Sequence, residues 1–253
     1  MGQDRCVAGP GTGEMGAVDG IAEWTSAQRR VIELVEGLSA EQAEVRVPAC
    51  PDWRVRDLFA HMVGLGVDVV GGDEPDDHNA AWTERQVQQR RDHDLAALVA
   101  EWESVAEPLR EWMRANGIRP LGDVIIHEQD LRGALGRPGG QDTAGLDAIR
   151  DRFAARFRDR AAALPPIALL GDRWQWASRG VPDDAPVALR AGDFDLARAL
   201  VSRRSAAQLR AWTVRGDVTE HLPAFATLGS LPDVDLTESE QDIQTERSEG
   251  VRE

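Results

Sequence analysis

The sequence predicts an α+β protein in which a four-helix bundle precedes a smaller domain of mixed helices and strands. Two observations predict this order. Apolar residues recur every three or four positions through the first half of the chain, the spacing of helices that bury one face. After residue 164 the pattern changes to short apolar runs separated by turn residues, which is typical of strands. The helical pattern is interrupted by Gly136, Pro138 and the pair Gly139–Gly140.

The chain is expected to divide into four segments. They are a flexible leader at residues 1–18, the bundle at 19–141, the α+β domain at 142–231 and a disordered tail at 232–253. The leader lacks the apolar core of a signal peptide. The tail is acidic and nearly free of large apolar residues. It therefore has too little apolar surface to form a packed structure of its own.

Composition excludes several classes of function. The net charge is −15, with an isoelectric point of about 4.8. Nucleic-acid binding is therefore not expected as the main role, because contacts to phosphates need a dense basic patch. No apolar run approaches the roughly 20 residues that span a bilayer, so no membrane partner is expected and the cytoplasm is the default compartment. The two cysteines, Cys6 and Cys50, cannot form a disulfide framework.

The bundle helices follow from the apolar periodicity. They are expected at residues 21–38, 55–70, 80–116 and 120–135, the third bent or broken near 92–94. Pro51 and Asp52 indicate the start of the second helix, because aspartate accepts hydrogen bonds from free N–H groups at a helix start. Asn116 and Gly117 are typical of the end of the third. Short connections favour an antiparallel bundle, in which sites are built from inward side chains.

The second domain is expected to begin with a helix and to continue with a small sheet. The expected order is a helix at 146–164, strands at 167–170, 173–177 and 187–189, a helix at 194–201, the stretch 205–214 and a helix at 218–228. In the second strand, alternation of Trp174 and Trp176 indicates a period of two.

A metal site is predicted from three side chains of the bundle. His61 lies on the apolar face of its helix, while Asp123 and His127 are four residues apart and therefore share one helix face. Imidazole and carboxylate suit Zn²⁺ and similar ions, and three protein ligands leave the open position that is typical of catalytic zinc. Asp130 could orient His127 or reach the metal, and Asp57 could do the same for His61.

The spacing also allows a structural interpretation. His61 and His127 could be core histidines, and Asp123 suits a helix start electrostatically. The remaining histidines are interpreted as solvated or structural: His78, His93 and His221.

Three stretches resemble one known family. CPDWRVRDLFAHMVG, from Cys50, resembles the first signature of the mycothiol-dependent maleylpyruvate isomerases, a branch of the DinB-like helical bundles. DVIIHEQDLRGALGRP, from Asp123, resembles the second signature, and RRSAAQLRAWTVRGD, from Arg203, is similar to the C-terminal module of actinobacterial members. The resemblance covers about Ile21 to Leu231 and implies a DinB-like bundle with a small α+β domain.

The resemblance implies a divalent metal, usually zinc, held by His61, Asp123 and His127. The acid in the family is glutamate, so with the shorter Asp123 the metal would lie closer to that helix or bind more weakly. The implied cofactor is the thiol mycothiol, whose metal-bound thiolate attacks a small electrophile. The implied activity is that of an isomerase or a thiol S-transferase in a monomer or homodimer.

Because such electrophiles are often anionic, arginines are expected at the mouth of the site. Asp130 and Arg204 are predicted to be catalytic, and Arg56, Arg132 and Arg203 to bind the cofactor. Arg203 and Arg204 stand out because the second domain could cover the site. Each arginine could instead be an exposed, solvated charge.

Two other classes of function remain open. In a metal-dependent hydrolase, the open position would hold water, with Asp57 or Asp130 as general base. A non-catalytic metal-binding or regulatory protein could use the same fold. Activity without any thiol favours the first alternative, and absence of thiol-dependent activity favours the second.

Overall fold

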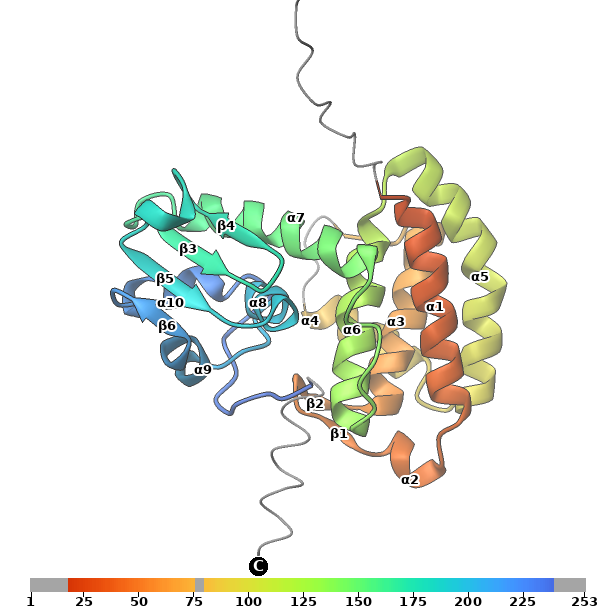
Figure 1. Ribbon diagram of the computed structural model, residues 1–253. Helices are drawn as coiled ribbons and strands as arrows, with labels where there is room; N and C mark the ends of the chain where they lie inside the picture. The colour runs from red at the N-terminus through yellow and green to blue at the C-terminus, as the bar shows by residue number, and fades with distance from the viewer. Residues whose placement is uncertain (1–17, 76–79, 239–253) are drawn as a thin grey trace, which may run out of the picture.

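The computed structural model describes residues 18–75 and 80–238, and it confirms the α+β class. Figure 1 shows a helical part beside a smaller part built on a sheet. The bundle consists of α1 (Gly20–Glu36), α3 (Val55–Gly71), α5 (Leu95–Asn116) and α6 (Arg119–Leu135). Both α1 and α3 pack against α5 and α6, which brings α3 and α6 side by side. No helix in the described part of the chain is long and apolar enough to cross a membrane.

The second bundle helix begins at Val55, as the apolar periodicity predicts, but the residues just before it form a strand that the sequence analysis did not predict. Cys50–Arg54 forms strand β2, which pairs antiparallel with β1 (Arg46–Val47), and α3 starts only at Val55. The residue before a proline prefers an extended backbone, so Pro51 favours a strand at Cys50. The start of α3 is held by Asp57, whose Oδ2 accepts a hydrogen bond from the backbone N–H of Arg54 at 2.9 Å.

The expected break in the third helical segment is confirmed. Helix α4 (Ala80–Gln89) ends before Asp94, whose side chain accepts a hydrogen bond from the N–H of Ala97 and caps α5. Helix α4 packs on α3, so it covers the face of the helix that carries His61. A short helix, α2 (Ala40–Ala43), lies between α1 and β1.

The second part contains a mixed sheet in the order β4-β3-β5-β6. Its central strands β3 (Ile167–Leu170) and β5 (Val187–Arg190) are parallel, and the edge strands β4 (Gln175–Ala177) and β6 (Thr213–Arg215) are antiparallel to them. Its helices are α7 (Ala144–Arg160), α8 (Asp193–Leu200), α9 (Ala206–Ala211) and α10 (Leu222–Phe225), with single turns η1 (Pro182–Asp184) and η2 (Thr219–His221).

Two elements of this part are shorter than the sequence predicts. Strand β4 starts at Gln175 because the backbone N–H groups of Arg173 and Trp174 donate to the carboxylate of Asp193 instead of to a neighbouring strand. The expected helix at 218–228 is only the turn η2 followed by α10. Pro223 lies in the first turn of α10, where its missing N–H is tolerated, and it could not lie inside a longer helix without breaking it.

The segment expected to be a disordered tail is ordered over its first residues. Leu236 and Glu238 are buried, and the side-chain amide of Gln208 donates to the carbonyl of Leu236 at 2.9 Å. Glu238 can be buried because Arg198 and Arg204 pair with its carboxylate. Residues 239–253 lie outside the described part of the chain, as does the leader to residue 17.

A continuous apolar core joins the two parts. It runs from the bundle through α7 to strands β3 and β5. On α7, the ring of Phe157 lies 4.4 Å from that of Phe225 and 6.0 Å from that of Trp176, measured between centroids. Helix α7 also packs on α6, so it stands beside the helix that carries Asp123 and His127.

Candidate metal centre

Helices α3 and α6 bring His61, Asp123 and His127 together. Asp123 Oδ1 lies 3.3 Å from His61 Nε2 and 3.5 Å from His127 Nε2. The two imidazole rings meet edge to face, with centroids 5.2 Å apart. One donor atom from each residue lies within 4.8 Å of the other two. His61 is buried, whereas Asp123 and His127 are partly exposed, so the group is open on one side.

The proton on His61 is placed by Gln86 of α4. His61 Nδ1 lies 2.7 Å from Gln86 Oε1, and the amide nitrogen of Gln86 donates to Asp68 Oδ2 at 2.8 Å. Because that amide nitrogen is engaged with a carboxylate, the oxygen of Gln86 accepts from His61 Nδ1–H. The lone pair of His61 Nε2 therefore faces Asp123, as a metal ligand requires.

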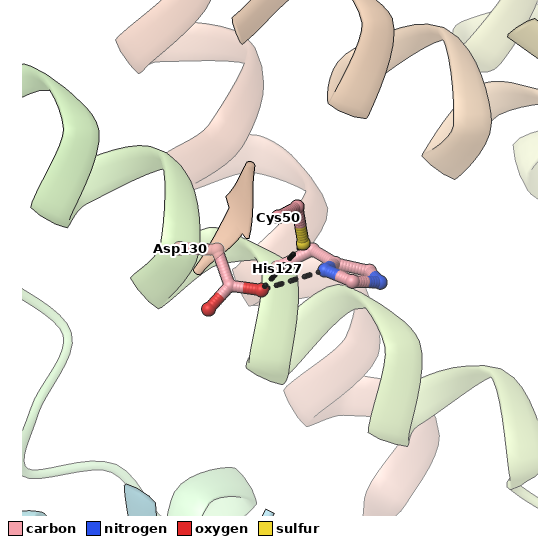
Figure 2. Close-up of side chains that lie close together, drawn as sticks. All are labelled: Cys50, His127 and Asp130. Carbon is pink, nitrogen blue, oxygen red and sulfur yellow. Dashed lines mark hydrogen bonds and ion pairs between the residues drawn. The ribbon is translucent and has the colours of Figure 1, made fainter. Parts of the chain in front are cut away.

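The proton on His127 is placed by Asp130. His127 Nδ1 lies 2.9 Å from Asp130 Oδ2, the contact drawn in Figure 2. Burial by itself would raise the pKa of Asp130, but the charges of Arg203 and Arg198 outweigh it and hold the pKa well below its usual value. Asp130 is therefore a carboxylate that accepts from His127 Nδ1–H, and His127 Nε2 is left with its lone pair toward Asp123.

Cys50, His127 and Asp130 form a second group of donor atoms within 4.8 Å of one another (Figure 2). This group is a poor cation site. Burial, followed by the charge of Asp130, raises the pKa of the Cys50 thiol to about 12, whereas a metal needs the thiolate. The guanidinium of Arg203 contacts both Cys50 and Asp130, and its charge repels a cation. The group supports His127 instead of forming a separate metal centre.

A cavity of about 510 Å³ opens onto the three side chains. Its walls are largely apolar and include Leu65 and Val69 of α3, Ile126 of α6 and Phe153 of α7. A larger cavity of about 810 Å³ is lined by residues of α1, α2, α3 and α5, and it shares no lining residue with the first. The smaller cavity places the three candidate metal ligands beside a space large enough for a small molecule.

The four arginines expected at the mouth lie elsewhere. Arg56 donates to the carbonyl of Arg91, and Arg132 is held by Glu128. Arg203 and Arg204 are buried in ion pairs, Arg203 with Asp130 and Arg204 with Asp195 and Glu238. None of the four lines the cavity. These contacts satisfy the guanidinium groups within the protein, which a sequence pattern cannot reveal.

The cavity is instead lined by Arg119, Arg152 and Arg156. The sequence did not predict a role for these three arginines or for Gln86. Gln86 follows Trp82 by four residues on one face of α4, and a polar residue in an apolar stripe was the available signal. Arg152 and Arg156 are also four residues apart, on α7. Their position could not be inferred without knowing that α7 packs beside α6.

The other singled-out residues lie apart from the three donors. Asp57 caps α3, and His221 is buried with Nε2 2.9 Å from the carbonyl of Pro165. His93 Nδ1 lies 3.6 Å from Glu101 in a half-exposed ion pair. His78 lies outside the described residues.

Comparison with known proteins finds one family model that matches part of the chain. Residues 24–119 match the family model of the mycothiol maleylpyruvate isomerase N-terminal domain, a segment that includes His61 and stops before Asp123. Two crystal structures are similar to the chain: mycothiol-dependent maleylpyruvate isomerase (11% identity, TM-score 0.51) and its histidine-to-alanine mutant (10%, 0.53). Each similarity covers 73% of this chain and 88% of the other, and at these identities it shows a shared fold. No curated protein matches the sequence.

Proposed function

We propose, from the premise that residues 24–119 form a mycothiol maleylpyruvate isomerase N-terminal domain, that this protein is a metal-dependent isomerase or S-transferase. It uses a small thiol, mycothiol or a close analogue, as nucleophile toward a small electrophile. The observation that carries the proposal is the arrangement of His61, Asp123 and His127. Both imidazoles are held by their Nδ1 atoms, and both Nε2 atoms face one carboxylate oxygen.

These three residues fit a divalent ion. Two imidazole nitrogens and one carboxylate oxygen are a ligand set of catalytic zinc, and Zn²⁺ is therefore the ion we propose. When bound, the ion supplies Lewis acidity that lowers the pKa of a thiol and favours its thiolate. Within this set Asp123 takes the place of the longer glutamate expected in the family.

The neighbouring residues orient the ligands and shape the cavity. Gln86 and Asp130 fix the tautomers of the two imidazoles, so neither ring has to turn or lose a proton from Nδ1 before it binds. Apolar side chains of α3, α6 and α7 exclude water from one side of the cavity, which protects a thiolate from protonation. Addition of the thiolate to a carbon–carbon double bond would serve both reactions. In an isomerase, the adduct would rotate about the former double bond and expel the thiolate again. In a transferase, the carbanion would take up a proton and the sulfur would stay attached to the product.

Neither of the two residues considered as general base for the hydrolase alternative is suited to that role. Asp57 accepts the N–H of Arg54 at the start of α3, away from the cavity. Asp130 is bound by two arginines, and its pKa, well below the usual value, makes it a weak base.

We also propose that the protein acts in the cytoplasm, as a monomer or homodimer, without nucleic-acid or membrane partners.

The proposal is tested by turnover of a cis-alkene electrophile with mycothiol, in wild type, Asp123→Asn and Asp123→Glu proteins. Asp123→Asn removes the anionic ligand, so we expect at least about a hundredfold loss of thiol-dependent rate. Asp123→Glu restores the acid of the family and should retain most of the rate. His93→Ala, outside the site, is the control and should behave as wild type. A rate that does not depend on thiol would refute the proposal, as would equal rates in wild type and Asp123→Asn.

A further inference from the structure

The last described residues lie between the two parts of the chain in the way that a bound peptide would. We call Asp235–Glu238, with the sequence DLTE, the C-terminal motif. In Figure 1 the dark blue end of the chain leaves the second part and reaches the bundle near β2. The connection before the motif is exposed at residues 228–230 and 233–234. The motif is therefore held by its own contacts and not by the chain that leads to it.

The first contacts of the motif are those that proteins use to recognise an extended peptide. The side-chain amide of Gln208 on α9 donates to the carbonyl of Leu236 at 2.9 Å and accepts from its N–H at 3.4 Å. One amide thus pairs with both backbone groups of Leu236, as a neighbouring strand would. The side chain of Leu236 is 4% exposed. Ser205 donates its hydroxyl to the carboxylate of Asp235.

The last residue of the motif supplies a charge that its surroundings require. Arg198 donates twice to Glu238 Oε1, at 3.2 and 2.7 Å, and Arg204 donates to Oε2 at 2.6 Å. The amide of Gln141 donates to the carbonyl of Glu238 at 2.6 Å. Among the ion pairs of the described residues, removal of Glu238 would leave three buried guanidinium groups with two carboxylates: Arg198, Arg203 and Arg204 with Asp130 and Asp195. An unbalanced buried cation is unfavourable, so this place favours an anionic side chain.

The surface of α6 is shaped to admit the motif. A Cβ atom added to Gly133 would lie 2.5 Å from Glu238 Cγ, so glycine allows Glu238 to lie against the helix. Glycine is otherwise unfavourable inside a helix. A cavity of about 140 Å³ remains beside the motif, next to Pro48 and Ala49. Protein cores are closely packed, so this cavity marks a docked segment and not a part of the core.

We propose that the groove around the C-terminal motif is a peptide-binding site, which is filled by the motif of the same chain and accepts the same motif from another chain. The pattern that it recognises is an acid, a leucine, a residue of any type and a glutamate. A second copy of this chain carries such a motif. The inference goes beyond the proposed function and requires neither a metal nor a thiol.

The test is fluorescence anisotropy with a labelled peptide of residues 231–238, blocked at both ends, and the full chain carrying Leu236→Asp. This substitution puts a carboxylate in a buried apolar position, so the chain's own motif should leave the groove. The peptide should then bind and saturate. In the wild type the motif is tethered at an effective concentration on the order of millimolar, so the peptide should bind at least about a hundredfold more weakly. Equal binding to both proteins would overturn the proposal.

Matched controls identify the groove as the place of binding. Gly133→Ala added to Leu236→Asp obstructs the position of Glu238 without changing a charge, and it should weaken peptide binding at least about tenfold. Gly71→Ala, where nothing lies within 4 Å of the added Cβ, should leave binding within about twofold. A peptide with Glu238→Gln should bind at least about tenfold more weakly, because hydrogen bonds to a charged group are lost. Acetate that displaces the labelled peptide as well as unlabelled peptide does would overturn recognition of a peptide.

A second measurement does not depend on the folding of the Leu236→Asp protein. A protease recognition sequence is inserted after Ser230, in the exposed connection, and the full chain is cut after it has folded. The released piece should remain with the rest of the protein in size-exclusion chromatography, and an excess of the peptide of residues 231–238 should displace it. A piece that separates at once at micromolar concentration, or that no excess of peptide displaces, would overturn the proposal.

Discussion

At the scale of single residues, the site depends on polar groups that are already paired. Asp130 shows this most clearly, because one carboxylate serves His127, Arg198 and Arg203 at once. The arginines keep it ionised, and the ionised form is the one that accepts from His127 Nδ1–H. Cys50, next to this group, is kept in the opposite state. Its thiol is partly buried beside a carboxylate and holds its proton.

The state of Cys50 predicts a pH dependence. Burial and then the charge of Asp130 raise the thiol pKa from 9.0 to about 12 in the folded protein. The raised pKa means that the unfolded chain loses this proton first, so the stabilisation is complete below pH 9 and is lost as the pH rises toward 12. In a Cys6→Ser background, iodoacetamide at pH 9 should modify folded protein at least about a hundredfold more slowly than protein in urea. Similar rates in the two conditions would show that Cys50 is an ordinary thiol.

At the scale of elements, the site is a crossing of helices that touch closely. Helix α4 approaches α3 at Gly64, where an added Cβ would lie 2.6 Å from Gln86 Cβ. Glycine at this position lets Gln86 reach His61, so the spacing of two helices sets the tautomer of a metal ligand.

Gly64→Ala should therefore disturb the site without touching a ligand. The methyl group must push α4 away, and overpacking of this kind costs about 1–3 kcal/mol in the free energy of unfolding. Because Gln86 moves with α4, zinc affinity measured by chelator competition should fall about tenfold or more. Gly71→Ala, at the open end of the same helix, has nothing within 4 Å of its added Cβ and should change neither quantity. Unchanged zinc affinity in Gly64→Ala would contradict a role for Gln86.

The elements that the sequence predicted correctly are those with local signals. Apolar periodicity, together with the end signal at Asn116 and Gly117, predicted the bundle helices and a break near residues 92–94. The strand at Cys50–Arg54 was missed because its pairing with Arg46–Val47 competes with a plausible helix start. At the site, the helical spacing brought together Asp123 and His127, and the inward face supplied His61. Gln86 and Arg152 could not be foreseen, because their positions depend on how α4 and α7 pack.

At the scale of the whole molecule, one buried ionic network ties the two parts together. Asp130 of the bundle pairs with Arg198 of α8, and Arg198 also pairs with Glu238 near the end of the described chain. Arg204 pairs with Glu238 as well. All four side chains are buried. The network links the partner of His127 to the C-terminal segment, so the segment contributes to the order of the site.

Glu238→Gln tests this connection. Removing one partner of a buried ion pair leaves charges unbalanced, and losses of about 3–5 kcal/mol are typical. Urea denaturation should show a loss of at least about 2 kcal/mol, with Glu220→Gln as the exposed control at which no loss is expected. Equal stability of Glu238→Gln and wild type would mean that the segment does not hold the two parts together.

The central claim is that His61, Asp123 and His127 bind a divalent ion, and metal stoichiometry tests it most directly. Elemental analysis of purified wild type should find about one zinc or similar ion per chain. His61→Ala and His127→Ala should lose it while their circular dichroism stays native, and His93→Ala should keep it. Metal-free wild type whose melting temperature does not change on addition of zinc would contradict the claim, and the two histidines would then be core residues.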